Sequence, residues 1–241
     1  MKTHAIKTHL IQLDESLPAL LDRYLPPLEE NSIVVVTSKI VSLSEGRTIQ
    51  KKIGKETLIK QEADAYLDEP NPHGVLLTIK NGILIPNAGI DESNANGVYI
   101  LYPKDSHLSA RKIWEHLRTQ HRLRHLGVLI TDSHTSPMRW GVTGIALAWC
   151  GFAPLNNYIG TPDCFGRHLH FTKANVVDAL AASAVFAMGE GNEQTPLALI
   201  TELEKVTFVE SAPTQEEIES LKIPMQEDLY GPLLMKGDWK S

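Results

Sequence analysis

Aliphatic runs and stretches with helical spacing alternate irregularly along this chain. Apolar runs predict strands or hairpins in four segments: 32–41, 74–86, 98–103 and 127–132. Apolar spacing and end signals predict five helices: 16–25, 55–67, 106–122, 174–189 and 214–221. Because strands and helices follow one another without a fixed order, the pattern favours a mixed α+β fold over a regular doubly wound sheet.

Local signals sharpen several of these predictions. Asn81-Gly82 separates two apolar runs, which is a strong hairpin signal. Ser106 is placed to cap the helix that follows it, and Thr214 with Glu217 forms the sequence pattern of a capping box.

Composition places the chain among ordinary globular proteins. With 241 residues, 42% of them hydrophobic, residues 1–241 can form one unit with room for two lobes. A net charge of −6 argues against non-specific binding to nucleic acid or to an acidic membrane. Cys150 and Cys164 are too few for a disulfide framework, and the longest apolar run, 144–155, is too short to span a bilayer. We therefore expect a soluble cytoplasmic protein.

Three acidic residues follow predicted elements. Asp91 comes after ILIP, Asp132 after VLIT, and Glu190 just past a long helix. Two carboxylates about 4 Å apart would repel by roughly 4 kcal/mol at an effective dielectric near 20, whereas a divalent cation would reverse that sign. With Ser133, these residues would supply ligands for Mg²⁺ or Mn²⁺. The alternative is that Asp91 and Asn94 make Asx turns, Asp132 caps an element and Glu190 is solvated.

Other candidate chemistry is weaker. Small residues in 38–47 and 188–196 could cradle phosphate, although neither segment is a Walker loop. Lys39, Arg47 and Arg139 could supply positive charge, and each is equally compatible with an ordinary surface position. The histidines of 121–125 would share a helical face and those of 168–170 a strand face. Both pairs lack a third ligand, so we expect them to be ordinary residues.

Five segments in order resemble motifs of one enzyme family. They are TSKIVSLSEGR (37–47), NAGIDESN (87–94), LITDS (129–133), GTPDCFGRHL (160–169) and DALAASAVFAMGE (178–190). Together they are similar to the coenzyme F420-0:γ-glutamyl ligase family, and the collinear order over most of the chain makes the resemblance specific.

The resemblance implies an activity and an assembly. It implies ligation of the α-amine of L-glutamate to a carboxylate of a deazaflavin coenzyme precursor, coenzyme F420-0, through an acyl phosphate. GTP or ATP would be the co-substrate, a divalent metal would be required, and a monovalent cation such as K⁺ would assist. It also implies an α+β homodimer of intertwined subunits, for which the aromatic segment 149–160, with Trp149, is our candidate interface.

The resemblance also assigns residues. Asp91 and Asp132, the catalytic pair, would bind one metal ion, and Ser133 and Glu190 a second. The nucleotide would contact Ser38, Lys39 and Asn94, and its phosphates would lie against the backbone of Gly189, Gly191, Asn192 and Thr195.

Two departures leave the acceptor open. Leu43 replaces a Lys of the family pattern, and Thr135-Ser136 replaces Gly-Arg, although Arg139 and Gly141 are retained. Charge-assisted contacts to phosphate are worth about 1.5–3 kcal/mol each, so the nucleotide or acceptor would be held differently here. The same chemistry on tetrahydrofolate, and a non-catalytic metal- and nucleotide-binding regulator, remain the alternatives.

Overall fold

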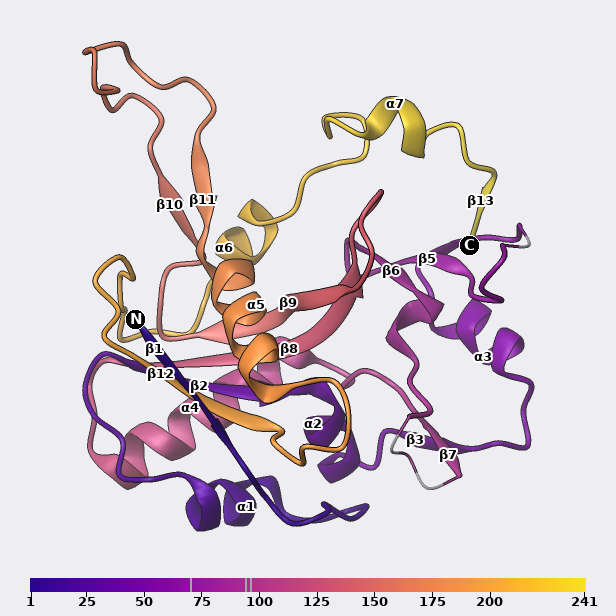
Figure 1. Ribbon diagram of the computed structural model, residues 1–241, viewed down its shortest axis with the longest axis horizontal. Helices are drawn as coiled ribbons and strands as arrows, with labels where there is room; N and C mark the ends of the chain where they lie inside the picture. Colours follow the sequence, from indigo (N-terminus) through magenta and orange to yellow (C-terminus); the bar gives the residue numbers. More distant parts are fainter. Residues whose placement is uncertain (70, 94, 96) are drawn as a thin grey trace.

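A five-stranded sheet forms the centre of the protein (Figure 1). The computed structural model describes residues 1–69, 71–93, 95 and 97–241. The strands, in spatial order, are β1 (Lys2–Ile6), β12 (Leu197–Thr201), β2 (Ser32–Thr37), β8 (Leu126–Thr135) and β9 (Val142–Cys150). Strands β2 and β8 are parallel, and the other neighbouring pairs are antiparallel.

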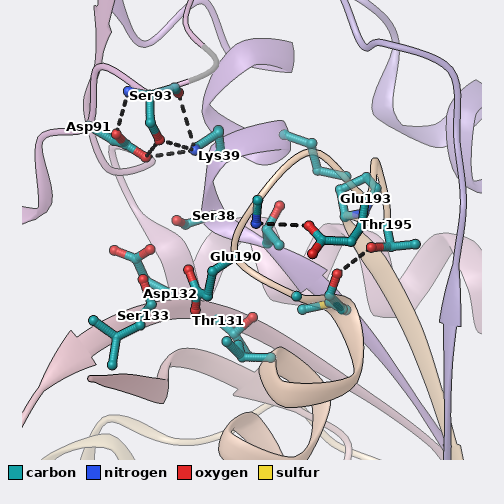
Figure 2. Close-up of a pocket in the computed structure, with 18 of the residues that line it drawn as sticks. Ser38, Lys39, Asp91, Ser93, Thr131, Asp132, Ser133, Glu190, Glu193 and Thr195 are labelled. Atoms are coloured by element: carbon teal, nitrogen blue, oxygen red, sulfur yellow. Dashed lines mark hydrogen bonds and ion pairs between the residues drawn. The ribbon is translucent and has the colours of Figure 1, made fainter. Parts of the chain in front are cut away.

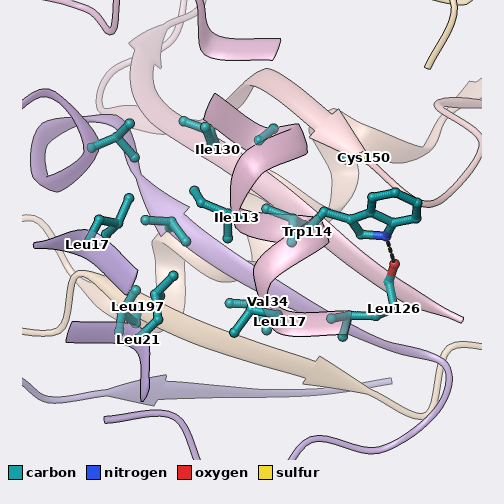
Figure 3. Packing of buried hydrophobic residues seen from close by; sticks show 14 of the residues in the cluster. Leu17, Leu21, Val34, Ile113, Trp114, Leu117, Leu126, Ile130, Cys150 and Leu197 are labelled. Carbon is teal, nitrogen blue, oxygen red and sulfur yellow. Dashed lines mark hydrogen bonds between the residues drawn. The ribbon is translucent and has the colours of Figure 1, made fainter. Parts of the chain in front are cut away.

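Helices cover both faces of this sheet. One face packs against α1 (Leu17–Tyr24), α2 (Ser38–Ser44) and α4 (Ser106–His121), and the other against α5 (Val176–Met188) and α6 (Gln215–Ser220). In β2, Val34 and Val36 join the first cluster, part of which Figure 3 shows, while Ile33 and Val35 join the second. A central strand buried on both faces explains the uninterrupted apolar run at this position.

A second lobe is built on a four-stranded sheet. Its strands, in order, are β13 (Trp239–Lys240), β4 (Ala65–Leu67), β5 (Leu77–Lys80) and β6 (Ile83–Pro86). The remaining elements of the lobe are β3 (Thr48–Gln50), α3 (Lys55–Glu62), the 3₁₀ turn η1 (Asn87–Gly89) and β7 (Val98–Ile100). The C-terminal segment crosses from α6 through α7 (Gly231–Leu234) to β13 in this lobe (Figure 1). The predicted mixed α+β class is therefore confirmed.

A narrow arm, β10 (Leu155–Asn157) and β11 (Lys173–Asn175), projects from the main sheet (Figure 1). Phe165 and Phe171 on the arm are 85% and 92% exposed. By contrast, Trp149 is buried in the core of its own subunit. The expectation that Trp149 forms an interface is therefore wrong, because the β9 register directs this side chain into the cluster under α5.

Several local predictions are confirmed. Strands β5 and β6 form the hairpin, with Asn81 and Gly82 at φ values of 55° and 79°, the left-handed conformations that such a turn requires. Both bonds of the capping box at Thr214 and Glu217 are present. The helices predicted at 16–25 and 174–189 correspond to α1 and α5.

Other boundaries are wrong for tertiary reasons. The predicted strand 32–41 ends at Thr37, and the next seven residues form α2, whose apolar side chains pack on the core. The predicted helix 55–67 ends at Glu62, because 65–67 pairs with β5 as β4. Asp105, rather than Ser106, caps α4 through a bond from the Leu108 amide.

The two histidine pairs do not have the geometry that their spacing in the sequence predicts. Helix α4 ends at His121 because Arg122 adopts a left-handed conformation, so the pair in 121–125 does not share a helical face. His168 makes an isolated bridge outside the strands, so the pair in 168–170 does not lie on a strand face. In the described residues, no helix is both long and apolar enough to cross a membrane.

Candidate active site

A cavity of about 510 Å³ lies where the main sheet meets the second lobe. It is lined by the ends of β2 and β6, by α2, by β8, and by the loop between α5 and β12. The acidic and phosphate-binding candidates that line this cavity are Ser38, Lys39, Asp91, Asp132, Ser133, Gly189, Glu190, Gly191, Asn192 and Thr195. Asn94, the remaining candidate, lies outside the described residues. These candidates, which are up to 157 positions apart in the sequence, from Ser38 to Thr195, thus line one space.

The first wall of the cavity is the turn after β6. Asn87, Ala88 and Gly89 have φ values of 55°, 52° and 71°, an uncommon run of left-handed residues. The chain then leads to Asp91, whose backbone bridges Ile100. This turn directs the Asp91 carboxylate toward α2 (Figure 2).

Asp91 is paired in this wall. The Lys39 ammonium lies 2.6 Å from its Oδ2, and the Ser93 amide donates to its Oδ1 at 2.6 Å. Lys39 also donates to the Ser93 hydroxyl at 3.1 Å (Figure 2). Burial raises the pKa of Asp91, but the bonds and charge of Lys39, together with the Ser93 bonds, outweigh it and leave the pKa lowered. The Asx-turn bond that we considered as the alternative role of Asp91 is therefore present. It lies in a cavity that also contains the Lys39 ammonium group.

The second wall is the end of β8. The parallel pairing with β2 stops at Thr131, while β8 and β9 continue together to Thr135 and Val142. A register shift between Ile130 and Thr131 precedes this extension. Asp132 therefore lies inside a strand, and the expectation that it ends the strand is wrong.

Asp132 has a different environment from Asp91. The Tyr102 hydroxyl donates to its Oδ2 at 2.6 Å. Burial raises the pKa of Asp132 to about 6, against the bonds from Tyr102 and the Ser133 backbone, and the negative charge of Asp91 adds to the rise. The charge of Asp91 thus acts on Asp132 across the cavity.

Gly89 joins the two walls. A Cβ atom at this glycine would lie 2.1 Å from the Tyr102 ring, the ring whose hydroxyl bonds to Asp132. Its φ of 71° is also one that glycine adopts without penalty. Glycine in the NAGID motif therefore lets the turn approach the tyrosine that holds Asp132.

Glu190 and Ser133 meet at the edge of the cavity. A hydrogen bond with Ser133 lowers the pKa of Glu190, but partial burial is the larger effect and the pKa is raised. Asp91 and Glu193 add negative charge nearby. Figure 2 shows Glu190 beside Asp132 and Ser133.

The loop after α5 supplies backbone groups. The Gly191 amide bonds to the Glu193 carboxylate at 2.8 Å, and the Thr195 hydroxyl bonds to the Met188 carbonyl. The Gln194 carbonyl accepts from the Thr8 amide at 2.9 Å, which ties the loop to the N-terminal segment. The loop is therefore held by its own side chains in a form that exposes glycines to the cavity.

The donor set suits hard cations that complete their coordination with other ligands. In the part of the chain that the structure describes, no three His, Cys, Asp or Glu side chains could hold one metal ion together. Mg²⁺ commonly takes one or two carboxylates and obtains its other oxygens from water and phosphate. The buried Thr131 hydroxyl, which also lines the cavity, has no protein partner among the described atoms and offers one more oxygen.

Sequence reasoning missed part of the site. Thr8, His9, Leu10 and Ile11 form one side of the cavity, although no motif marks them. Tyr102 lies within the run 98–103, which predicts a strand and no contact with the site. Its bond to Asp132 depends on two separate strands meeting, so local sequence does not reveal it.

Comparison with known proteins gives a consistent result. The family model described as F420-0:Gamma-glutamyl ligase matches residues 5–202. The coenzyme F420:L-glutamate ligase of Methanococcus maripaludis strain C6 is 34% identical over 77% of this chain and 80% of its own length. The protein of the same name from Methanosarcina barkeri is 30% identical over 92% of this chain and 96% of its own. This protein therefore belongs to the F420-0:gamma-glutamyl ligase family.

Proposed function

We propose that this protein uses a nucleoside triphosphate and divalent metal to join L-glutamate to a carboxylate of coenzyme F420-0. Family membership over residues 5–202 carries the proposal, because relatives across most of the chain have the name coenzyme F420:L-glutamate ligase. The geometry supports it, since the described residues of four family motifs meet at one cavity. The same names favour a deazaflavin acceptor over tetrahydrofolate.

Two pairs of residues would hold divalent metal. Asp91 and Asp132 would bind one ion, and Ser133 and Glu190 the other, with K⁺ assisting. Bound Mg²⁺ or Mn²⁺ supplies charge that neutralises a transferring phosphoryl group. Without it, the negative charges that raise the pKa of both Asp132 and Glu190 would oppose a polyphosphate.

Lys39 has a second role in this scheme. Its ammonium lies against Asp91, close enough to neutralise that carboxylate. A nucleotide phosphate beside Ser38 and Lys39 would offer the ammonium a competing anion, so Lys39 would bind phosphate while Asp91 turns to metal. In the loop after α5, a nucleotide phosphate would replace the Glu193 carboxylate that now accepts from the Gly191 amide.

The proposed reaction has two covalent steps. A carboxylate oxygen of the acceptor attacks the γ-phosphorus, the bond to the β-phosphate oxygen breaks, and nucleoside diphosphate leaves. The neutral α-amine of glutamate then attacks the acyl carbon, the bond to phosphate breaks, inorganic phosphate leaves, and the amine loses a proton. Phosphorylation is needed because oxide is a very poor leaving group, and the cavity residues orient the reactants.

An acceptor screen tests this function. Purified protein would be incubated with Mg²⁺, L-glutamate, GTP or ATP, and either F420-0 or tetrahydrofolate. We expect a product heavier by one glutamyl unit with F420-0, together with nucleoside diphosphate. Product formation with tetrahydrofolate but not with F420-0 would show that the proposed acceptor is wrong. Nucleotide binding without glutamate-dependent diphosphate release would instead identify a regulator. Leu43 lines the cavity in place of the family Lys, so the GTP and ATP arms are run separately.

We further propose that the protein is a homodimer, with the β10–β11 arm as its contact. The arm exposes Phe165 and Phe171, whose rings are not buried within their own chain and are available for a contact with a second chain. Light scattering should give twice the chain mass of 26.7 kDa, and F165S/F171S should reduce it to a monomer. A wild-type mass near that of one chain at micromolar concentration would contradict this.

A further inference from the structure

The tip of the β8–β9 hairpin carries side chains that the proposed chemistry does not use. Trp140 is 95% exposed and Met138 is completely exposed, and both follow the strand segment that holds Asp132. The hairpin extends beyond the main sheet toward the second lobe, near β5 and β6 (Figure 1). An indole in this position contributes little to the fold and is free to meet a ligand.

This tip lies at the rim of the catalytic cavity. The hairpin residues below it, His134, Thr135 and Val142, line the cavity together with Asp132. From the opposite lobe, the exposed His73 ring approaches Trp140 edge-on, with ring centroids 6.5 Å apart and planes at 85°. Two nearly perpendicular aromatic rings from separate lobes therefore meet at the rim of the cavity, and the 95% exposed indole still offers surface to a ligand.

The spacing restricts what these rings would bind. Asp132 and Thr135 are three strand residues apart, which corresponds to about 10 Å at roughly 3.3 Å per residue, and the tip lies farther still. A ligand that reaches both places must therefore have its reacting group about 10 Å or more from a planar ring. L-glutamate is too short and has no ring.

The tip also carries a cation. Across residues 1–69, 71–93, 95 and 97–241, no ion pair involves the Arg139 side chain, which is exposed beside Trp140. An arginine next to an indole suits an anionic ligand with an aromatic end, because guanidinium binds carboxylate or phosphate and the ring stacks.

We propose that Trp140 and His73 form an aromatic clamp for the planar ring of the carboxylate acceptor, in which the acceptor ring stacks on the indole and the perpendicular His73 ring borders it. Arg139 would bind the anionic chain that joins the acceptor ring to the reacting carboxylate. The proposal rests on the function proposed above and adds the site that would recognise the acceptor. It assigns the ring to the hairpin tip and the carboxylate to the cavity below. A deazaflavin has the required planar ring.

A second copy of the chain is a poorer occupant of this tip. Stable interfaces bury about 800 Å² on each partner, and here the apolar surface is limited to Met138, Trp140 and the half-exposed Val142. The arm, in contrast, presents its own separate set of apolar residues. A small planar ligand matches the size of the hairpin tip.

Binding and kinetics of Trp140 variants test the clamp. Trp114 and Trp149 are buried and Trp239 is partly exposed, so the part of the fluorescence quenching that W140F removes reports on Trp140 during titration with F420-0 and with FMN, a planar anionic probe. We expect W140A to raise the Kd and KM for F420-0 about tenfold, with kcat and the KM values for nucleotide and glutamate unchanged. W140F should restore most of the affinity, and R139Q should weaken binding and its dependence on salt.

F186A is the matched control, because Phe186 is a 90% exposed aromatic residue on α5, and it should bind like wild type. The clamp is wrong if W140A binds F420-0 as tightly as wild type, if wild type binds neither F420-0 nor FMN, or if W140A changes only the oligomeric mass. If Trp140-dependent binding is present but no glutamate is ligated, the clamp stands and the proposed function fails. If ligation to F420-0 occurs with no effect of W140A, the function stands and the clamp fails.

Discussion

The two walls of the cavity hold aspartates in opposite electrostatic states. In the wall formed by the turn after β6, Asp91 accepts bonds from Lys39 and Ser93, and its pKa is lowered. In the wall formed by the end of β8, Asp132 accepts bonds from the neutral Tyr102 hydroxyl and the Ser133 backbone, and burial raises its pKa to about 6. Identical side chains thus differ because Lys39 forms an ion pair with Asp91, whereas its charge lowers the pKa of Asp132 too little to offset burial.

The difference suggests a division of roles. Asp91 has its charge compensated by an ion pair, whereas ionised Asp132 is only partly compensated until a metal ion binds. A bound metal ion should therefore stabilise ionised Asp132 more than it stabilises Asp91, which already has an ion pair. The wall at β8 is therefore where we expect metal and substrate to have the larger effect on stability.

The largest effect is expected where the walls touch. G89A should lower the free energy of unfolding by about 3–4 kcal/mol, since the new Cβ would meet the Tyr102 ring and the residue would keep a left-handed φ. G74A is the matched control, with a φ of 65° and no atom within 4 Å, and should cost about 1 kcal/mol. Equal losses in chemical denaturation would mean that the walls are not coupled through this contact.

Neutralising each aspartate should separate activity from stability. D132N should reduce turnover at least about a hundredfold, because a metal ligand and its charge are lost. Its raised pKa means that ionised Asp132 costs stability as pH rises from about 4 through 6, so at pH 7 in EDTA the variant should be about 1 kcal/mol more stable than wild type.

D91N is the comparison within the same cavity. The lowered pKa of Asp91 means that its carboxylate contributes stability above the unfolded pKa, and this is lost as pH falls. D91N should therefore lose turnover as D132N does, but should be less stable than wild type at pH 7. Thermal melts that shift in the same direction for both variants would remove the contrast between the walls.

Removing metal should weaken nucleotide binding about twentyfold. The carboxylates of both walls and of Glu190 repel a polyphosphate unless a cation lies between them. Calorimetric titration of GTP and ATP in Mg²⁺, Mn²⁺ or EDTA at matched ionic strength would measure this. Equal affinities in Mg²⁺ and EDTA would show that the acids do not face the phosphates.

The smallest effect concerns the cation of the first wall. K39M should weaken nucleotide binding about tenfold through loss of one charge-assisted bond, while changing stability by less than about 1 kcal/mol because the pair with Asp91 is partly exposed. K51M, which breaks the surface pair with Glu92, should leave nucleotide affinity unchanged. Loss of binding in both variants would indicate a general charge effect instead of a contact by Lys39.

Local sequence predicted much of the fold. The Asn81-Gly82 turn, the capping box at Thr214 and the spacing of α5 are determined by neighbours a few residues apart, so a single sequence contains the information. The predicted strand 32–41 was wrong at its end because Ile40 and Val41 can be buried either in a strand or in a helix. Only packing of α2 against the core decides that it is helical.

The candidate site divides in the same way. The sequence by itself determined which residues carry oxygen ligands and that Asp91 and Glu190 follow the ends of elements, because residue type and local periodicity are properties of short segments. Only the tertiary structure decided that Asp91 pairs with Lys39, that Tyr102 bonds to Asp132, and that Trp140 meets His73. Those contacts join residues 30 to 67 positions apart, and both pKa shifts depend on burial and charge that exist only after distant strands have packed together.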